Sequence, residues 1–258
     1  MMRKPLRSQL RLWEKLSTVK YRRREGLFLA EGYKVVNELI NSTWEPRAIM
    51  ILGEKRHQWD TFLSTVDKSV DIYELSKKDW NTLTQDKESE GIIALVAMPR
   101  HIDIMEALIQ GAGHMVLLYR ISNPNNLGAI LRTVHWFGIG TVVLSAGSVD
   151  FTNPKVVRAA MGGLFHLSVV QDVDFEKVLP RIREHFFLVG GNNREGVTPH
   201  ACAQRTALLM GSESHGLPDT LIRLAHEQWH IPGAGKGESL SLPQAAAIMI
   251  YECTKRGH

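Results

Sequence analysis

Hydrophobic residues repeat along the chain with two alternating periods, which predicts alternating strands and helices. Short stretches rich in apolar residues, typical of strands, fall at residues 28–30, 48–52, 71–75, 92–98, 115–119, 141–145, 167–170, 186–189, 207–210 and 228–231. Between them, apolar positions recur every three or four residues, as on one face of a helix, at 6–17, 32–40, 58–66, 77–83, 128–137, 154–161, 175–184, 218–224 and 243–251. This pattern is typical of an α/β protein, and the uninterrupted apolar strands favour a mainly parallel sheet covered on both faces.

The alternation weakens once, around Pro99 and the Gly-Ala-Gly sequence that ends at Gly113. Turn-forming residues of this kind mark linkers, although a short helix is predicted at 104–109. A chain of 258 residues is long enough for two ordinary domains. We therefore predict a small N-terminal domain over 1–99, a linker over 100–113 and a larger domain over 114–258.

Composition places the chain among globular proteins, with 44% hydrophobic and 22% charged residues. No apolar run is long enough to span a membrane, and the first residues lack the apolar core of a signal peptide. Cys202 and Cys253 have neither disulfide-framework nor zinc-site spacing, so a reducing cytoplasm is expected. The eleven histidines show no metal-binding spacing, so no metal site is predicted.

Positive charge is concentrated at the N-terminus. Residues 1–24 carry nine Lys and Arg residues against one acid, Glu14, although the whole chain has a net charge of only +4. Such a cluster favours binding to a polyanion, because neutralised phosphates release their counterions. The alternative is a solvated helix face. The nine cations are Arg3, Lys4, Arg7, Arg11, Lys15, Lys20, Arg22, Arg23 and Arg24.

Three polar or glycine-rich loops follow predicted strands and precede predicted helices, at 122–127, 211–218 and 231–241. Open α/β sheets bind ligands at the carboxyl ends of their strands, where helix N-termini also present free N–H groups. The three loops together therefore indicate an enzyme site. For Ser239 and Ser241, at the start of the last helix, simple N-capping is the alternative role.

Several familiar sites are excluded by spacing. The glycines of the third loop, Gly233, Gly235 and Gly237, do not form a P-loop, and no dinucleotide-binding G-x-G-x-x-G follows a strand. Ser212 and Ser214 do not form the nucleophile elbow of a hydrolase. A dinucleotide-dependent oxidoreductase thus lacks its glycine signature and would require demonstrated NAD(P) binding.

In this order and spacing, the loops resemble the SpoU/TrmH family of RNA 2′-O-ribose methyltransferases, part of the SPOUT class. The similarity covers about residues 115–251, and residues 25–40 resemble the start of a ribosomal-protein-like RNA-binding domain. The matching positions are Asn126 and Arg132 of an N-x-x-x-x-x-R motif, Gly211, Glu213 and Gly216 of a G-x-E-x-x-G motif, and Ile231, Pro232, Ser239 and Leu240 of an I-P…S-L-N motif.

The resemblance implies a trefoil-knotted α/β fold with a mainly parallel sheet, preceded by a small α/β RNA-binding domain. It implies methyl transfer from S-adenosylmethionine to a ribose 2′-hydroxyl of RNA, by a cytoplasmic homodimer with sites near its interface. Ribosomal RNA is the favoured substrate, transfer RNA the next, and DNA is not expected. The implied catalytic residues are Asn126, Arg132, Glu213 and Ser239, and the implied cofactor contacts are Gly211, Ile231 and Leu240, with Gly191 as a further candidate.

Within this scheme, Arg132 is expected to orient the acceptor and hold its phosphate, because a guanidinium keeps its proton in proteins and is a poor base. The chain departs from the family pattern at Ser241, where Asn is usual, at Gly233, where Met is usual, and at Pro243. Serine offers fewer hydrogen-bonding groups than asparagine. A non-catalytic RNA-binding protein that retained the fold therefore stays open as an alternative, and cofactor binding distinguishes the two.

Overall fold

The computed structural model describes residues 2–100, 104, 113–235 and 239–255, and the chain divides into two compact units. The first contains Met1–Arg100 and Thr152–Phe165, and the second contains His101–Phe151 and His166–His258. The predicted linker at 100–113, with its helix at 104–109, lies almost wholly outside the described residues. Sequence order alone does not predict that Thr152–Phe165 groups with the first unit.

The first unit is a four-stranded mixed sheet with helices on both faces. The strand order is β1-β4-β2-β3, in which β4 runs antiparallel to β1 and β2, whereas β2 and β3 are parallel. Its elements are α1 (Arg7–Lys15), α2 (Val19–Glu25), β1 (Leu27–Glu31), α3 (Tyr33–Ile40), β2 (Pro46–Leu52), the 3-10 turn η1 (Gly53–Gln58), α4 (Asp60–Leu63), β3 (Asp71–Leu75), α5 (Lys77–Leu83), β4 (Ile92–Ala97), α8 (Pro154–Ala159) and the 3-10 turn η2 (Gly163–His166), which ends this unit's second segment.

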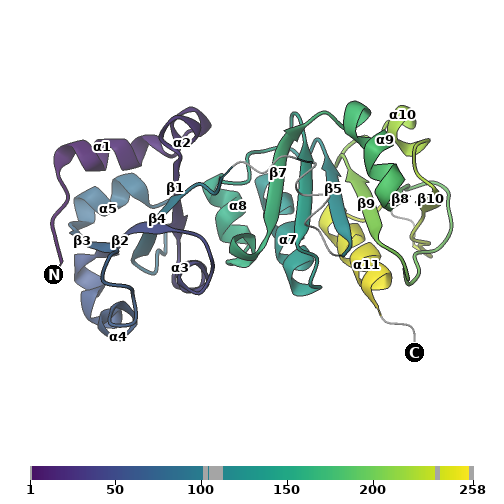
Figure 1. Cartoon of the computed structure of the whole chain (residues 1–258). Coiled ribbons are helices and arrows are strands. Elements are labelled where there is room, and N and C mark those ends of the chain that lie inside the picture. The colour runs from purple at the N-terminus through teal and green to yellow at the C-terminus, as the bar shows by residue number, and fades with distance from the viewer. Residues whose placement is uncertain (1, 101–103, 105–112, 236–238, 256–258) are drawn as a thin grey trace. The chain divides into compact units, whose positions relative to one another are not determined.

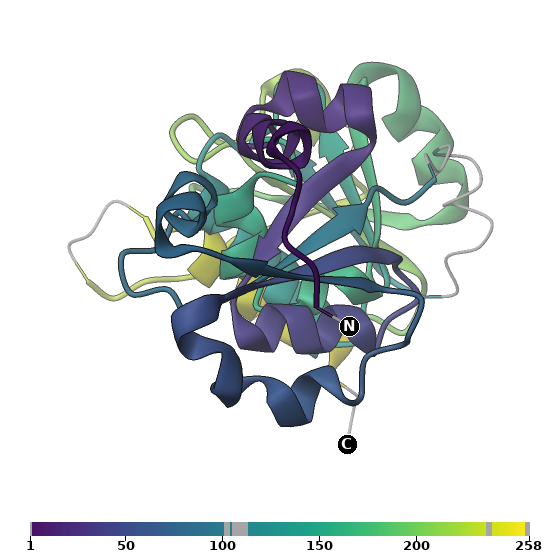
Figure 2. The same ribbon diagram turned by 90° about the vertical axis from the view of Figure 1, so that its left-hand side faces the viewer.

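Alternating side chains of β2 bury both faces of this sheet. Met50 packs with Trp13 of α1 and Trp80 of α5, and all three are almost fully buried. Ile49 and Ile51 point to the opposite face, because successive side chains of a strand alternate. Figure 2 shows α1 above the sheet and α3 below it.

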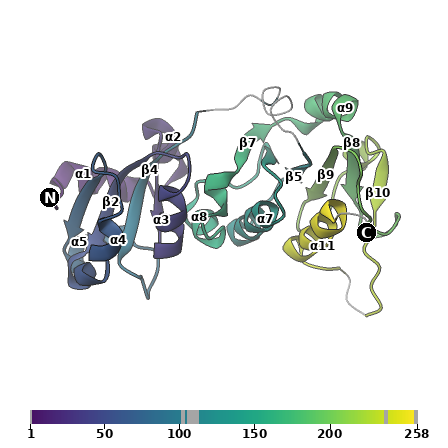
Figure 3. The ribbon, with the colours of Figure 1, turned by 60° about the horizontal axis from the view of Figure 1, so that its bottom comes forward.

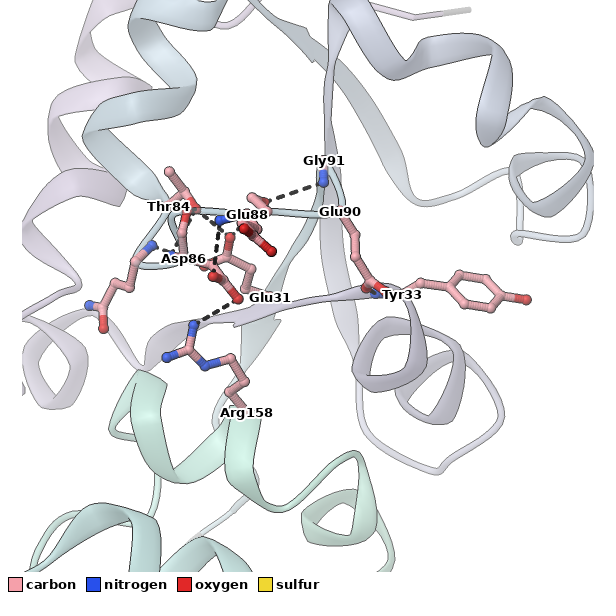
Figure 4. A network of polar contacts seen from close by, with 10 residues as sticks. Glu31, Tyr33, Thr84, Asp86, Glu88, Glu90, Gly91 and Arg158 are labelled. Carbon is pink, nitrogen blue, oxygen red and sulfur yellow. Dashed lines mark hydrogen bonds and ion pairs between the residues drawn. The ribbon is translucent and has the colours of Figure 1, made fainter.

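A polar network joins the loop before β4 to β1 and α8 (Figure 4). The carboxylate of Glu31 accepts hydrogen bonds from the N–H of Gln85 at 3.0 Å and the hydroxyl of Ser89 at 2.8 Å. Arg158 of α8 forms an ion pair with Asp86 of the same loop at 3.0 Å. These contacts link the loop before β4 to β1 and to the 152–165 segment.

One of the nine N-terminal cations is structural. Arg22 lies in α2, a helix that the sequence pattern did not predict, and only 2% of it is exposed. Its guanidinium donates to the hydroxyl of Thr152 at 2.9 Å and to the carbonyls of Leu16 and Ser17 at 3.2 and 3.1 Å. The prediction that all nine cations form a polyanion-binding surface is therefore wrong for Arg22.

Arg22→Met should destabilise the first unit by about 1–3 kcal/mol, since it leaves buried acceptors without their donor while keeping most of the side-chain volume. Urea unfolding followed by tryptophan fluorescence measures this, because four of the six tryptophans lie in the first unit. Lys20→Met on the exposed side of the same helix is the control and should be nearly neutral. Equal midpoints for the two variants would contradict the assignment.

The second unit is a six-stranded parallel sheet with strand order β10-β8-β9-β5-β6-β7. This arrangement confirms the predicted mainly parallel sheet. Its elements are β5 (Met115–Tyr119), α7 (Pro124–Trp136), β6 (Thr141–Ser145), β7 (Ser168–Val173), α9 (Phe175–His185), β8 (Phe187–Gly191), β9 (Thr206–Gly211), α10 (Asp219–Ile222), β10 (Glu227–Trp229) and α11 (Leu242–Thr254).

Helices cover both faces of the parallel sheet (Figures 1 and 3). Leu179 of α9 and Leu221 of α10 bury one face against Leu117 and Leu209. α7 and α11 lie side by side on the other face, where the rings of Phe137 and Tyr251 are 5.9 Å apart. Among the described residues, no helix has the length and apolar character needed to cross a bilayer.

Candidate functional site

Four strands of the second unit end at the same edge of the sheet. Tyr119 of β5 pairs with Gly211 of β9, and Gly191 of β8 pairs with Trp229 of β10. Since all these strands are parallel, the loops that follow them leave from one edge. The loops that carry the predicted site residues therefore leave the same edge of the sheet, although Asn126 and Ser239 are 113 positions apart in the sequence.

The first loop passes directly into α7. Asn123 caps this helix, since its side-chain oxygen accepts a hydrogen bond from the N–H of Asn125 at 2.9 Å, and Pro124 occupies the first helical position. The helix thus begins at Pro124 and not at 128 as predicted. Its first turn therefore includes Asn126, whose side chain starts from a rigid position.

Glu213 joins the second loop to the first. Its carboxylate accepts hydrogen bonds from the N–H of Ser122 at 3.1 Å, the hydroxyl of Ser122 at 3.3 Å, the N–H of Asn123 at 3.0 Å and the side-chain amide of Asn126 at 3.3 Å. Burial alone would raise the pKa of Glu213, but the hydrogen bonds from Asn123, Ser122 and Asn126 lower it overall. The carboxylate therefore stays ionised and braces the two loops.

Arg132 lies on another side of α7. Its side chain is exposed and has no hydrogen bond or ion pair with any residue that the structure describes. Six residues separate it from Asn126, and at 100° per residue the two point about 120° apart around the helix. The structure thus brings Asn126 and Glu213 together but not Arg132. Arg132 lies on a different face of α7, together with Trp136 one helical turn later.

A glycine is required at position 211, because the backbone of the neighbouring strand β5 leaves no room for a side chain. The φ of Gly211 is +111°, and a Cβ atom there would lie 2.3 Å from the carbonyl oxygen of Tyr119. Any other residue would push β5 and β9 apart at their ends. At Gly191, a Cβ would meet Met249 and Met210 at 3.4 and 3.5 Å, which is ordinary contact. A side chain at 211 would therefore disturb the fold before it disturbed a ligand.

The third loop ends in a capped helix. Ser241 is the N-cap of α11 and forms a capping box with Gln244, whose side-chain oxygen accepts the N–H of Ser241 at 3.2 Å. Ile231 is half-buried, Ser239 is exposed, and Leu240 is 47% exposed despite its apolar side chain. Gly237 lies outside the described residues. The described residues contain no group of three or more potential metal ligands.

A comparison with known protein families identifies the family to which the sequence of the second unit belongs. The sequence profile of the SpoU rRNA Methylase family matches residues 113–251, more than half of the chain. The chain belongs to this SpoU family. The profile of the MRM3-like substrate binding domain matches residues 7–94 of the same SpoU chain.

Curated relatives match most of this SpoU protein. The chain is 28% identical over 242 residues to the 23S rRNA (guanosine(2553)-2′-O)-methyltransferase RlmP of Bacillus subtilis, with 93% of each chain covered. It is 25% identical to a TrmH family tRNA/rRNA methyltransferase of Staphylococcus aureus, covering 88% of this chain and 95% of the relative.

Solved structures share the fold over nearly the whole length. A TrmH family protein from Porphyromonas gingivalis overlaps with a TM-score of 0.82 at 26% identity, covering 97% of this chain and 98% of that one. The SpoU methyltransferase AviRb from Streptomyces viridochromogenes, solved in complex with AdoMet, has a TM-score of 0.83 at 25% identity, with 96% and 97% covered. The predicted family and SPOUT fold class are confirmed.

Sequence reasoning missed two residues of the site. Ser122 provides two of the four hydrogen bonds to Glu213, and nothing in its sequence context distinguishes it from an ordinary loop serine. Asn123 was assigned to a loop, although Asn followed by Pro is a recognised helix start. Both residues position the loops and so extend the candidate site.

Proposed function

We propose that this SpoU protein transfers the methyl group of S-adenosylmethionine to a ribose 2′-hydroxyl of RNA, with ribosomal RNA as the favoured substrate. The observation that carries the proposal is the carboxylate of Glu213, which ties two motif loops together at the edge where four parallel strands end. The 2′-O activity named for RlmP and the cofactor named for AviRb support the same reaction.

The residues at this edge fit S-adenosylmethionine. Leu240 presents an apolar side chain to solvent, as an adenine ring requires, while Gly191, Gly211 and Ile231 lie at or just beyond strand ends, where backbone groups are free to bind a ligand. When bound, the cofactor supplies an electrophilic methyl group. The chain's own residues hold it and exclude water from it.

Arg132 provides the cation for the acceptor RNA. Its guanidinium is free of described partners, so it can donate a bidentate pair of hydrogen bonds to a phosphate and hold the adjacent ribose in line with the methyl group. It cannot be the base, because it does not lose its proton. We infer that the hydroxyl proton passes to the phosphate oxygen held by Arg132, while Asn126, Glu213 and Ser239 keep the loops in place.

The test is methyl transfer from labelled S-adenosylmethionine to unmodified ribosomal RNA, followed by digestion to nucleosides. We expect the label in a 2′-O-methylnucleoside. Label on a base would overturn the assignment of the ribose as the methyl acceptor. Label found only when transfer RNA is supplied would make transfer RNA the substrate instead. Bound cofactor and bound RNA without any transfer would favour the non-catalytic alternative.

Leu240→Asp should weaken S-adenosylmethionine binding about tenfold or more, since it replaces an apolar contact with a charge; a tenfold loss is about 1.4 kcal/mol. Calorimetric titration measures the Kd. Val19→Asp is the matched control, because Val19 is also an exposed apolar residue, at 43%, but lies in α2. An unchanged Kd in the Leu240 variant would remove this residue from the cofactor site.

We further propose that the protein is a homodimer that associates through α7 and α11. This face exposes Trp136, Tyr251 and Ile248 at 82%, 53% and 39%, and neighbouring exposed apolar side chains of this kind are typical of interaction surfaces. A second copy is the favoured occupant because Trp136 lies one helical turn from Arg132, which matches sites near an interface. The partner chain would then lie close to Arg132, the cation proposed to bind RNA.

Trp136→Glu should convert the dimer to a monomer, because a buried, unpaired carboxylate at an interface is costly. Light scattering after size-exclusion chromatography measures the mass. Leu6→Glu, at a residue 67% exposed in the first unit, is the control and should leave the mass unchanged. A wild-type protein of monomer mass would refute the dimer, and an unchanged dimer in Trp136→Glu would refute this face.

The N-terminal unit is proposed to hold the RNA. Its exposed cations on α1 and α2, among them Arg7, Arg11 and Lys20, form a basic surface that can neutralise phosphates without reading sequence. The proposed division is an RNA-binding domain over 1–99 and a catalytic domain over 114–258, of which the segment Thr152–Phe165 groups with the first unit. The cytoplasm is the proposed location of the reaction.

A further inference from the structure

A second group of reactive side chains lies at the opposite end of the parallel sheet from the motif loops. Cys202 precedes β9, Cys253 lies in the last turn of α11, and His114 directly precedes β5. The N–H of Cys202 donates to the carbonyl of Cys253 at 3.1 Å, which places the two cysteines side by side, and each thiol shifts the pKa of the other. The thiol of Cys202 also lies 3.7 Å from the carbonyl oxygen of His200. Sγ of Cys253 lies 3.7 Å from Nδ1 of His114.

The two thiols differ in exposure and in charge. Cys202 is partly exposed, whereas Cys253 is 1% exposed. The hydrogen bond from Cys253 lowers the pKa of Cys202 to about 6, although burial opposes the shift. Donation of that bond and burial both raise the pKa of Cys253. Cys202 is thus the more exposed and the more acidic of the two thiols, and Cys253 is a protected thiol beside it.

We propose that Cys202 and Cys253 form a peroxide-reactive dithiol, in which Cys202 is the attacking residue and Cys253 the resolving one. Accessible thiolates next to a second cysteine are the typical sites of reversible oxidation. Disulfides that form transiently in redox sensing occur even in reducing compartments, so the proposal agrees with a cytoplasmic protein. It does not depend on the methyltransferase activity.

The chemistry balances with hydrogen peroxide as the oxidant. The Cys202 thiolate attacks one oxygen, the O–O bond breaks, and a sulfenic acid forms as hydroxide leaves. Cys253 then attacks the sulfenic sulfur, the S–O bond breaks, and the departing hydroxide takes up the thiol proton as water. Burial lowers the pKa of His114, so its ring stays neutral beside Cys253, and its Nδ1 accepts a hydrogen bond from the N–H of Thr206 at 3.3 Å.

The disulfide would restrain the helix that follows the third motif loop. α11 runs from Leu242, next to the capping Ser241, to Thr254, and its last turn would be bound to residue 202. The bond closes a loop between positions 51 apart in the sequence, which lowers the entropy of the unfolded chain. Oxidation should therefore raise the midpoint of thermal unfolding by several degrees.

The test is one equivalent of hydrogen peroxide added to the reduced full-length protein. We expect the free thiols to fall from two to none, the intact mass to fall by two hydrogens, and one proteolytic peptide pair to contain both cysteines. A thiol reductant should reverse all three changes. Added oxygen without the loss of two hydrogens, or a disulfide between two chains, would overturn the proposal.

Variants separate the two roles. In Cys253→Ala, Cys202 should stop at a sulfenic acid that dimedone traps, and in Cys202→Ala the buried Cys253 should stay reduced. Cys253→Ser keeps a hydrogen-bond donor beside Cys202, so its Cys202 should react with iodoacetamide severalfold faster than in Cys253→Ala. Oxidation of Cys253 in the absence of Cys202, or equal alkylation rates in the two Cys253 variants, would contradict the assigned roles.

Discussion

Arg132→Ala is expected to lower the single-turnover rate of methyl transfer by about 10²–10³-fold, the usual cost of removing one preorganised donor from a developing charge. The Kd for S-adenosylmethionine and the unfolding midpoint should not change, since the guanidinium has no partner among the described residues. The transfer rate of Arg132→Lys should fall between those of the wild type and Arg132→Ala, because lysine keeps the charge but loses the planar guanidinium.

The matched control is Arg223→Ala, which removes an exposed arginine of the same unit outside the three motif loops. It should transfer methyl groups at the wild-type rate. If Arg132→Ala did the same, Arg132 would have no part in the reaction. A lower unfolding midpoint in Arg132→Ala would show instead that the residue has a structural partner.

Strands were predictable where a short apolar or alternating stretch was bounded by polar residues. The strands β3, β5 and β6 begin and end as the hydrophobic pattern indicates. The helix α2 was missed because the sequence VKYRRRE has no apolar stripe. Its buried residue is Arg22, whose guanidinium donates a hydrogen bond to the hydroxyl of Thr152, 130 positions away. Only tertiary structure turns that arginine into a core residue.

The candidate site shows the same limit. The family motifs brought Asn126 and Glu213 into one hypothesis, and the structure shows them in contact across 87 positions of sequence. The motif spacing also determines that Arg132 points elsewhere on α7, because six residues make one and two-thirds turns of a helix. Ser122 was not predictable, since its two hydrogen bonds exist only once β5 and β9 are paired.

Glu213→Gln should weaken both folding and catalysis. A glutamine side chain has one acceptor oxygen and an NH₂ group that cannot accept, so it cannot satisfy the four donors of Ser122, Asn123 and Asn126. We expect a loss of about 1–3 kcal/mol in the free energy of unfolding and a lower transfer rate, as the two loops separate. Urea unfolding and single-turnover kinetics at neutral pH measure these effects.

The pH dependence of stability tests whether Glu213 acts through its negative charge or only through its shape. Because its pKa is lower in the folded protein than the usual 4.5, its contribution is complete above 4.5 and is lost as the pH falls through the folded-state pKa. The stability difference between wild type and Glu213→Gln should therefore shrink in acid. Glu184→Gln, at an exposed position of α9, should show no such difference. A constant difference down to acidic pH would mean that the carboxylate's charge does not brace the loops.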